Sequence, residues 1–441
     1  MENVTDSSLI EPARYNIRPI LVAVAVLVGV LACAAGFIHV WLSHWTYPEP
    51  VGMAVPSDVS HMFLYDATPR ARFAARFSDV FSVFAFGYGV TILILVLRTG
   101  LSSAFRAVAE KITRLGFVRT VLYIALLSTV LTATSLPISL FGLWYQWQFG
   151  LSTESFGTWA TQWATGFFVS LLTLEIVGVI VFALMRRFKR WWFPLWLSLI
   201  PIIAVGIFVA PIVVDPLFNT YTPMPPTPLK TRLEQLASRA GVPNIPIYVV
   251  DKSKQTNTTN AYVTGLGGSA RIVIWDTLLK KMDANEVVAI VGHEMGHYVL
   301  HHVFRGYVFT VLGLVFLLPL GQYGAEHIVR RKGTKWCLRG ASDIAVFPIF
   351  LFLLSCTEFV LQPVTNGISR EIEHEADAYG LKITHDGDDM ARAFIALSAQ
   401  NLGEPDPPKF IVWWRYSHPP IRDRVEFVLG HPVPLVPYPI R

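Results

Sequence analysis

Residues 291–297 read Val-Gly-His-Glu-Met-Gly-His, and the surrounding pattern predicts that they lie on a helix. Residues four apart share one face of a helix, so His293 and His297 can present two imidazole rings to one metal ion. Glu294 then lies beside the open coordination position, where a catalytic zinc site needs a base. The segment predicts a zinc-dependent hydrolase. Two histidines that share an ordinary amphipathic helix by chance are the simpler alternative.

The composition around this segment is typical of a membrane protein. Of the 441 residues, 53% are apolar and only 15% are charged. A helix needs about 20 apolar residues to cross a bilayer, and such runs recur along the chain. We predict a mainly α-helical, polytopic membrane protein in contact with the lipid bilayer, with spans at about residues 20–41, 80–97, 120–140, 164–185, 191–214, 307–323 and 344–364.

Charge and cysteine content exclude two other classes. The formal net charge is +5, but Lys and Arg cluster in short loops beside apolar runs, where membrane topology explains them, so nucleic acid is not expected as a partner. The three cysteines form no C-x-x-C pair, so neither a disulfide framework nor a cysteine-based zinc site is predicted. Residues 141–163 contain no Lys or Arg and many aromatic residues, which predicts a loop at the membrane interface.

The expected organisation has four parts. Residues 1–214 hold spans one to five, and residues 215–305 hold a soluble linker, a β-hairpin and the H-E-x-x-H helix. Residues 306–368 hold spans six and seven, and residues 369–441 form a C-terminal helical part. The second and fourth parts together would make a small α+β module that carries the metal.

A third metal ligand is expected just after span seven. Glu373 and Asp377 are four residues apart, so they share one helical face. We assign Glu373 as the ligand and Asp377 as the carboxylate that orients a ligand histidine. Glu371 or Glu375 could replace Glu373 in this assignment. Taken alone, the stretch could also be a charged helix end with salt bridges between successive turns.

Other residues are candidates for catalysis. Glu294 is expected to take the proton of the attacking water, and His418, in a soluble loop, to stabilise the developing oxyanion. Arg424 could bind a carboxylate or brace the site. The simpler interpretations are a loop histidine and a surface arginine. His301 and His302 are interpreted as helix-end residues near the membrane, with a smaller chance of contact with the site.

An extended substrate is best held by pairing with the edge of a sheet. Asn260, Ala261 and Tyr262 lie in the hairpin before the metal helix, and we place the substrate edge there. An ordinary structural hairpin explains the pattern about as well.

Several of these segments resemble one known family. The chain resembles the type 1 CAAX prenyl proteases, integral-membrane zinc metalloproteases, in the motifs Asp215-Pro216-Leu217-Phe218-Asn219, Asn260-Ala261-Tyr262, His293-Glu294-x-x-His297, Ser369-Arg370-x-x-Glu373-x-x-Ala376-Asp377 and Ser417-His418-Pro419-Pro420. The resemblance implies about seven transmembrane helices that enclose a chamber, a zincin-like module and one catalytic Zn²⁺. It also implies hydrolysis of peptide or protein substrates, with removal of the C-terminal tripeptide from prenylated ones. The family's roles coincide with those assigned above, with His418 and Arg424 as substrate or transition-state contacts.

Two questions stay open at this level. The basic loops follow spans two, four and six, which by the positive-inside rule puts the catalytic module outside. The eukaryotic family members are expected to have it on the cytosolic side, so either the rule fails here or this member faces its protease outward. The membrane is expected to be a bacterial inner membrane or, in a eukaryote, the endoplasmic reticulum. The alternatives in function are a broader membrane quality-control protease and, from another class, a transporter or receptor with a structural zinc. The oligomeric state is not predicted.

Overall fold

The computed structural model describes residues 64–265 and 269–436. Among them, six helices are long and apolar enough to cross a membrane. They correspond to predicted spans two to seven: α2 (Pro69–Arg98), α4 (Gly116–Gln148), α5 (Phe156–Arg187), α6 (Trp192–Val209) with a π-helical extension (Ala210–Val214), α10 (His302–Lys332) and α11 (Phe347–Thr384). These helices expose large apolar side chains, such as those of Phe168, Phe316 and Val360, as contact with lipid requires. The predicted span at residues 20–41 lies outside the described residues.

The predicted interfacial loop at residues 141–163 is wrong over most of its length. Helix α4 continues to Gln148 and α5 begins at Phe156, so the connection covers only residues 149–155. Packing against α2 explains the extra turns, because the Tyr145 ring stacks on Phe77 with centroids 5.2 Å apart and its hydroxyl donates to the carbonyl oxygen of Ala74. Aromatic content therefore marked a helix–helix contact here.

Helix α11 is longer than the span predicted for it. Pro348 lies in the first turn, where a missing N–H costs nothing, and Pro363 lies inside the helix without ending it. The helix continues from the membrane span through residues 369–377 without a break. The predicted division between residues 368 and 369 thus falls inside one helix, and the division between 305 and 306 falls inside α10.

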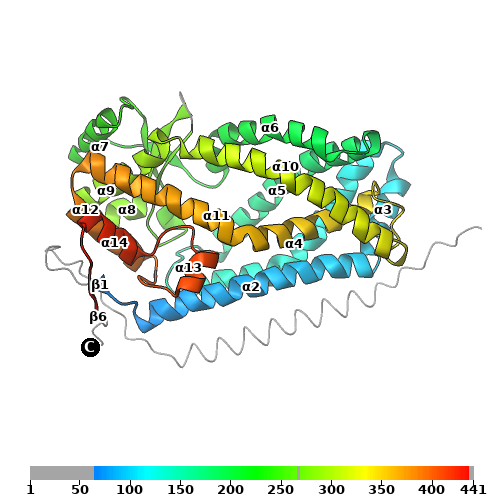
Figure 1. Ribbon diagram of the computed structural model, residues 1–441, viewed down its shortest axis with the longest axis horizontal. Helices are drawn as coiled ribbons and strands as arrows, with labels where there is room; N and C mark the ends of the chain where they lie inside the picture. Colours follow the sequence, from blue (N-terminus) through cyan, green and yellow to red (C-terminus); the bar gives the residue numbers. More distant parts are fainter. Residues whose placement is uncertain (1–63, 266–268, 437–441) are drawn as a thin grey trace, which may run out of the picture.

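The basic loops meet at one end of the bundle. A short helix, α3 (Leu101–Ile112), follows α2, and Arg106 on it forms a buried ion pair with Asp343 in the connection between α10 and α11. The connection between α5 and α6 joins the same end, since Gln322 of α10 donates to the carbonyl oxygen of Lys189 over 2.8 Å. Figure 1 shows α3 at the opposite end of the molecule from α7, α8, α9 and α12.

The other end is an α+β module. Its four-stranded sheet has the order β2-β3-β5-β4, in which β3 and β5 are parallel and the other pairs antiparallel. The predicted hairpin is confirmed as β4 and β5. The elements are β2 (Tyr221–Pro223), α7 (Pro228–Arg239), β3 (Ile247–Val250), β4 (Ala261–Thr264), β5 (Arg271–Trp275), α8 (Asp276–Lys281), α9 (Ala284–Val299), α12 (Gly387–Gln400), α13 (Lys409–Arg415) and α14 (Ile421–Leu429). A two-stranded parallel sheet of β1 (Leu64–Tyr65) and β6 (Leu435–Val436) lies beside it.

One apolar core holds the module together around α9. Leu236 of α7, Ile274 of β5, Met295 of α9 and Val425 of α14 are each essentially inaccessible to solvent within it. Burial of such a side chain stabilises a fold by about 1.5–3 kcal/mol relative to leaving it exposed. Because α7, the sheet, α12 and α14 all contribute to this core, α9 is held on several sides and its polar face has a fixed position.

Candidate metal centre

Helix α9 begins as the sequence predicts. The Asp283 side chain accepts from the backbone N–H groups of Asn285 and Glu286, and the Glu286 side chain accepts from the backbone of Asp283. This capping box satisfies N–H groups that the first turn of a helix leaves without partners. The predicted H-E-x-x-H segment therefore lies on a well-defined helix, with His293 buried and His297 partly buried.

Two glycines let α9 and α11 lie very close together. A Cβ atom on Gly296 would lie 2.9 Å from the Cα of Ala376, and one on Gly380 would lie 3.0 Å from the backbone nitrogen of His293. Side chains at either position would force the helices apart. This close approach brings Glu373 and Asp377 of α11 against the polar face of α9.

His293, His297 and Glu373 form the cluster that the sequence predicts. Their ligand atoms lie within 4.8 Å of one another, and this is the His/Cys/Asp/Glu group with that geometry in the part of the chain that the structure describes. Nε2 of His293 is 3.2 Å from Nε2 of His297 and 3.3 Å from Oε2 of Glu373, and Nε2 of His297 is 3.5 Å from Oε1 of Glu373. Of the two open alternatives, Glu371 is exposed and Glu375 faces other partners, so neither joins the cluster.

These three residues fit a tetrahedral metal ion. Ligand atoms about 2.1 Å from a tetrahedral zinc are about 3.4 Å from one another, which is close to the three observed separations. Oε2 of Glu373 is buried, and no donor among the described residues hydrogen-bonds to it. A buried carboxylate oxygen without a donor is costly, and a cation would supply the missing partner.

Asp377 orients the first histidine. Nδ1 of His293 lies 2.7 Å from Oδ1 of Asp377, so donation from Nδ1 leaves the lone pair of Nε2 directed at the cluster. Arg424 donates to the same carboxylate, from Nε to Oδ2 over 2.8 Å and from Nη2 to Oδ1 over 2.6 Å. Its guanidinium carbon also lies 3.9 Å from the ring centroid of Phe394. This buried side chain therefore braces Asp377, the second of the two roles that the sequence allows, and a substrate contact of Arg424 stays a prediction.

The two candidate catalytic side chains, Glu294 and His418, both lie close to the cluster. Oε1 of Glu294 is 4.0 Å from Nε2 of His293, too far for a shared hydrogen bond. Burial raises the pKa of Glu294 above its ordinary value of 4.5, although His293 and His297 oppose the shift. A raised pKa suits a carboxylate that must take and return a proton near neutral pH. Nε2 of His418 lies 3.4 Å from Oε1 of Glu373, and 57% of its side chain is exposed, so it borders the cluster from the open side.

One further residue, His302, contacts the cluster, and Glu375 and Arg305 lie behind it. Nδ1 of His302 lies 3.0 Å from Nδ1 of His297, and Nε2 of His302 lies 3.0 Å from Oε2 of Glu375. Arg305 forms an ion pair with Glu375. His302 is the first residue of α10, as the predicted helix-end position requires, and it is only 5% exposed. The spacing of five residues between His297 and His302 did not predict their contact, because on one continuous helix the two side chains would lie on different faces.

The predicted substrate edge lies at the rim of the sheet. Strand β4 pairs with β5 on one side, and it is the last strand in the sheet order. Ala261 is buried, whereas Asn260 is exposed and the Tyr262 hydroxyl lies 3.2 Å from that of Tyr221. Among the strands that the structure describes, none pairs with the outer side of β4, so this edge is where an added strand would pair.

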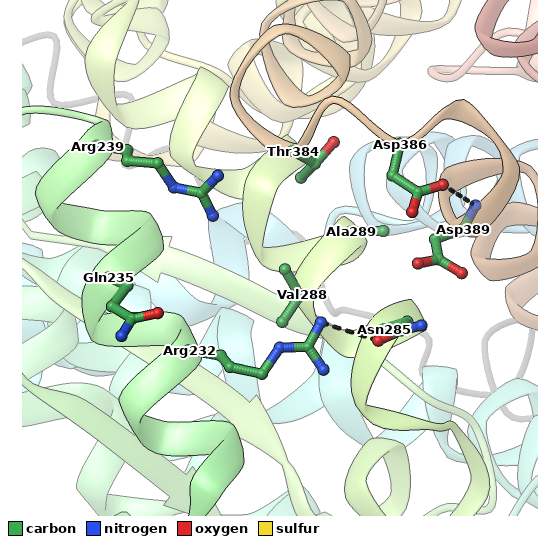
Figure 2. A pocket seen from close by; sticks show the side chains of 9 residues that line it. All are labelled: Arg232, Gln235, Arg239, Asn285, Val288, Ala289, Thr384, Asp386 and Asp389. Carbon is green, nitrogen blue, oxygen red and sulfur yellow. Dashed lines mark hydrogen bonds between the residues drawn. The ribbon is translucent and has the colours of Figure 1, made fainter.

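A surface pocket of about 120 Å³ lies near the start of α9 (Figure 2). Arg232 and Arg239 of α7 line one side, and Asp386 and Asp389 line the other. Asn285 lies eight residues before His293, about 12 Å along the helix axis at 1.5 Å per residue. The pocket shares none of its lining residues with the metal cluster, so it is a separate feature.

Two family models match this chain. The model of peptidase family M48 matches residues 223–431, and the model of the CAAX prenyl protease N-terminal region, described as five membrane helices, matches residues 52–220. The fold and the site together define an integral-membrane metalloendopeptidase. The chain belongs to peptidase family M48, with the N-terminal membrane region of the CAAX prenyl proteases.

Relatives and a solved structure agree with this membership. The chain is 32% identical to the uncharacterized metalloprotease YhfN of Bacillus subtilis, over 80% of this chain and 84% of that protein. It is 30% identical to CAAX prenyl protease 1 of Saccharomyces cerevisiae, over 69% of this chain and 70% of that protein. The fold matches the crystal structure of S. mikatae Ste24p with a TM-score of 0.71 at 23% identity, covering 92% of this chain and 96% of that one.

Proposed function

We propose that this protein is a zinc metalloendopeptidase in which His293, His297 and Glu373 hold one catalytic Zn²⁺. The observation that carries the proposal is the closeness of the donor atoms: the two Nε2 atoms are 3.2 Å apart, and each lies 3.3 or 3.5 Å from one of the two carboxylate oxygens of Glu373, which suits a metal ion between them. Two imidazoles and one carboxylate form a donor set that zinc peptidases use, with the fourth position left for water or substrate. A structural zinc would instead have four protein ligands and no need of a base beside it.

The chain's own residues supply the steps around the metal. Bound zinc would polarise the scissile carbonyl and make water more acidic. The Glu294 carboxylate takes the proton of the attacking water and returns it to the nitrogen of the leaving amine. His418 donates a hydrogen bond to the oxygen that becomes negative during attack. The outer side of β4 holds the substrate backbone in an extended form.

We propose prenylated peptides as the substrate class, with release of the C-terminal tripeptide. The name of the yeast relative, CAAX prenyl protease 1, supports this class. The course of α11 supports it as well, because Glu373 lies on the helix that forms the last membrane span. Glu373 is nine residues beyond the predicted span end at residue 364, about 14 Å along the axis. A lipid group among the membrane helices can therefore remain attached to a peptide that reaches the metal.

The test compares two peptides of identical sequence, one prenylated on its cysteine and one not, with purified wild-type protein and with Glu294→Gln. We expect wild type to cleave the prenylated peptide far faster. Glu294→Gln should lose cleavage while it keeps its zinc, because Glu294 is a base and not a ligand. Full cleavage by Glu294→Gln would contradict the mechanism, and equal cleavage of both peptides by wild type would contradict the substrate class.

We propose that the metal centre faces away from the cytoplasm. The support is the meeting of the basic loops at the end of the bundle that lies opposite the α+β module, since basic loops are retained in the cytoplasm. The connection at residues 149–155 lies at the module end, where Thr153 donates from its backbone to the carbonyl oxygen of Gln255. A reporter that is active only outside the cytoplasm should be active when fused within residues 149–155 or at the C-terminus. A reporter that is active only inside the cytoplasm should be active when fused within residues 330–339. The reverse pattern would overturn this orientation.

A further inference from the structure

A chain of polar contacts leads from His297 away from the metal cluster. Its Nδ1 lies 3.0 Å from Nδ1 of His302, and Nε2 of His302 lies 3.0 Å from Oε2 of Glu375. Arg305 closes the line with an ion pair to Glu375, in which Nη2 is 3.2 Å from Oε1. His302 is 5% exposed, so its ring is removed from water and depends on these two neighbours for hydrogen bonds.

One assignment of hydrogens satisfies every nitrogen in this line. If Nε2 of His297 gives its lone pair to a metal, its Nδ1 must carry the hydrogen. That hydrogen is donated to Nδ1 of His302, which must then carry its own hydrogen on Nε2. Nε2 of His302 donates to Glu375, which accepts it as a carboxylate. We propose that His302 is a positioning residue that holds His297 with Nε2 toward the metal, and that Glu375 and Arg305 hold His302.

The backbone between α9 and α10 makes this contact possible. His301 has φ 54°, a left-handed conformation, and it separates the end of α9 from His302, the first residue of α10. This break turns the chain so that His302 lies beside His297, although a continuous helix would carry residue 302 to another face. Arg305 lies one turn further along α10, and Glu375 lies two residues after Glu373 on α11. The positioning residues therefore come from the two membrane helices that flank the cluster.

The arrangement has a counterpart on the other ligand. His293 donates to Asp377, and Arg424 pairs with that carboxylate. Each ligand histidine is thus linked to a carboxylate that forms an ion pair with an arginine. The link is a direct contact for His293, and it passes through the His302 ring for His297. Partners of this kind fix the ring orientation of a ligand, and their removal typically costs about 10–100-fold in metal affinity.

This inference rests on the proposed zinc site, so its test measures metal binding and not activity alone. Zinc affinity is measured on the purified full-length chain by competition with a chromophoric chelator, and the Co²⁺-substituted protein gives a visible absorption spectrum that reports ligand geometry. His302→Phe keeps an aromatic ring but gives His297 no acceptor. We expect its zinc affinity to fall about 10–100-fold, with an altered Co²⁺ spectrum. His302→Gln can accept from His297 and donate to Glu375, so it should recover much of the affinity.

A matched control changes the neighbouring histidine. His301→Asn alters an exposed side chain and keeps a residue that tolerates the left-handed conformation, so it should bind zinc as wild type does. Thermal unfolding checks that each variant is folded. If His302→Phe does not fold, Glu375→Ala removes the outer contact from a half-exposed position, and a severalfold loss of affinity is expected.

The outcomes separate this inference from the proposed function. If folded His302→Phe binds zinc with wild-type affinity and has an unchanged Co²⁺ spectrum, the role of His302 is overturned and the zinc site is not. The same result in Glu375→Ala has this meaning if His302→Phe does not fold. Failure of wild type to bind zinc at all would overturn the proposed function, and the inference with it. Weakened binding in His302→Phe that His302→Gln restores would support both.

Discussion

Asp377 lies 2.7 Å from Nδ1 of His293 although 84 residues separate the two in the chain. The contact joins the helix of the H-E-x-x-H segment to the helix of the last membrane span. It also fixes which nitrogen of His293 is free to bind a metal. The metal centre is therefore assembled across the membrane domain, and its geometry depends on how α11 lies against α9.

Replacing Asp377 tests this contact. In Asp377→Asn, Arg424 stays buried without its counter-charge, and loss of one partner of a buried ion pair costs about 3–5 kcal/mol. The orientation of His293 is also weakened, so zinc affinity should fall about 10–100-fold. Chelator competition and thermal unfolding measure the two effects. Asp388→Asn changes an exposed carboxylate on α12 and is the matched control. Zinc affinity equal to that of the control would contradict the role of Asp377.

The close approach of α9 and α11 makes a second prediction. Ala at position 296 would place its Cβ 2.9 Å from the Cα of Ala376, and backbone cannot move aside cheaply. We expect Gly296→Ala to destabilise the protein by about 1–3 kcal/mol and to weaken zinc binding, because Glu373 moves away from the histidines. A Cβ on Gly313 of α10 would meet nothing within 4 Å, so Gly313→Ala should leave both properties intact. Equal zinc affinities in the two variants would show that helix separation does not set the site.

His418 gives a prediction about kinetics. Its Nε2 lies 3.4 Å from Oε1 of Glu373 on the open side of the cluster, where a substrate carbonyl would lie. His418→Ala should lower kcat by about 10²–10³-fold with little change in KM, as loss of one oxyanion donor does. His431, an exposed histidine beyond α14, provides the control His431→Ala. A change in KM alone, or a loss of bound zinc, would assign His418 to substrate binding or to the metal instead.

Asp276 gives a prediction about pH. Its carboxylate accepts from the backbone N–H of Ser253 and from Nζ of Lys280, each over 2.8 Å. Burial alone would raise its pKa, but the hydrogen bonds from Lys280 and Ser253 hold the pKa of Asp276 below its ordinary value of 3.8. Such a group stabilises the fold above the unfolded pKa, and this contribution is lost as the pH falls through the folded pKa.

The matching measurement compares wild type with Asp276→Asn. At pH 7 the variant should lose about 1 kcal/mol, the typical net value of a hydrogen bond, and should melt at a lower temperature. The difference between the two proteins should shrink as the pH falls below about 3.8, since Asp276 becomes neutral in wild type too. Melting followed by tryptophan fluorescence at several pH values measures it. A difference that stays constant down to pH 2 would exclude a charge effect.

The cluster itself was predictable from the sequence. His293 and His297 share a helix face by spacing, the capping box of Asp283 and Glu286 marks the helix start, and Glu373 with Asp377 shares a second face. These are local rules. They hold here because the H-E-x-x-H segment and the Glu373 segment each lie on a regular helix.

What the sequence missed depends on tertiary contacts. The His301 break that turns His302 toward His297 carries no glycine or proline as a signal. The contact of the buried Arg424 with Asp377 depends on how α14 packs against α11, and no local sequence pattern predicts that packing. The C-terminal end of α4 was predicted too early and the start of α5 too late. The reason is that an aromatic segment packed on α2 has the composition of an interfacial loop. The membrane span before residue 64 and the enclosed chamber stay predictions.

The central claim is that His293, His297 and Glu373 hold one catalytic zinc. Anomalous diffraction at the zinc absorption edge, from crystals of the zinc-loaded wild-type protein, tests it most directly. We predict one peak about 2.0–2.2 Å from Nε2 of both histidines and from a carboxylate oxygen of Glu373. A zinc peak elsewhere in the molecule, or none at this cluster in a protein that cleaves peptide, would contradict the claim.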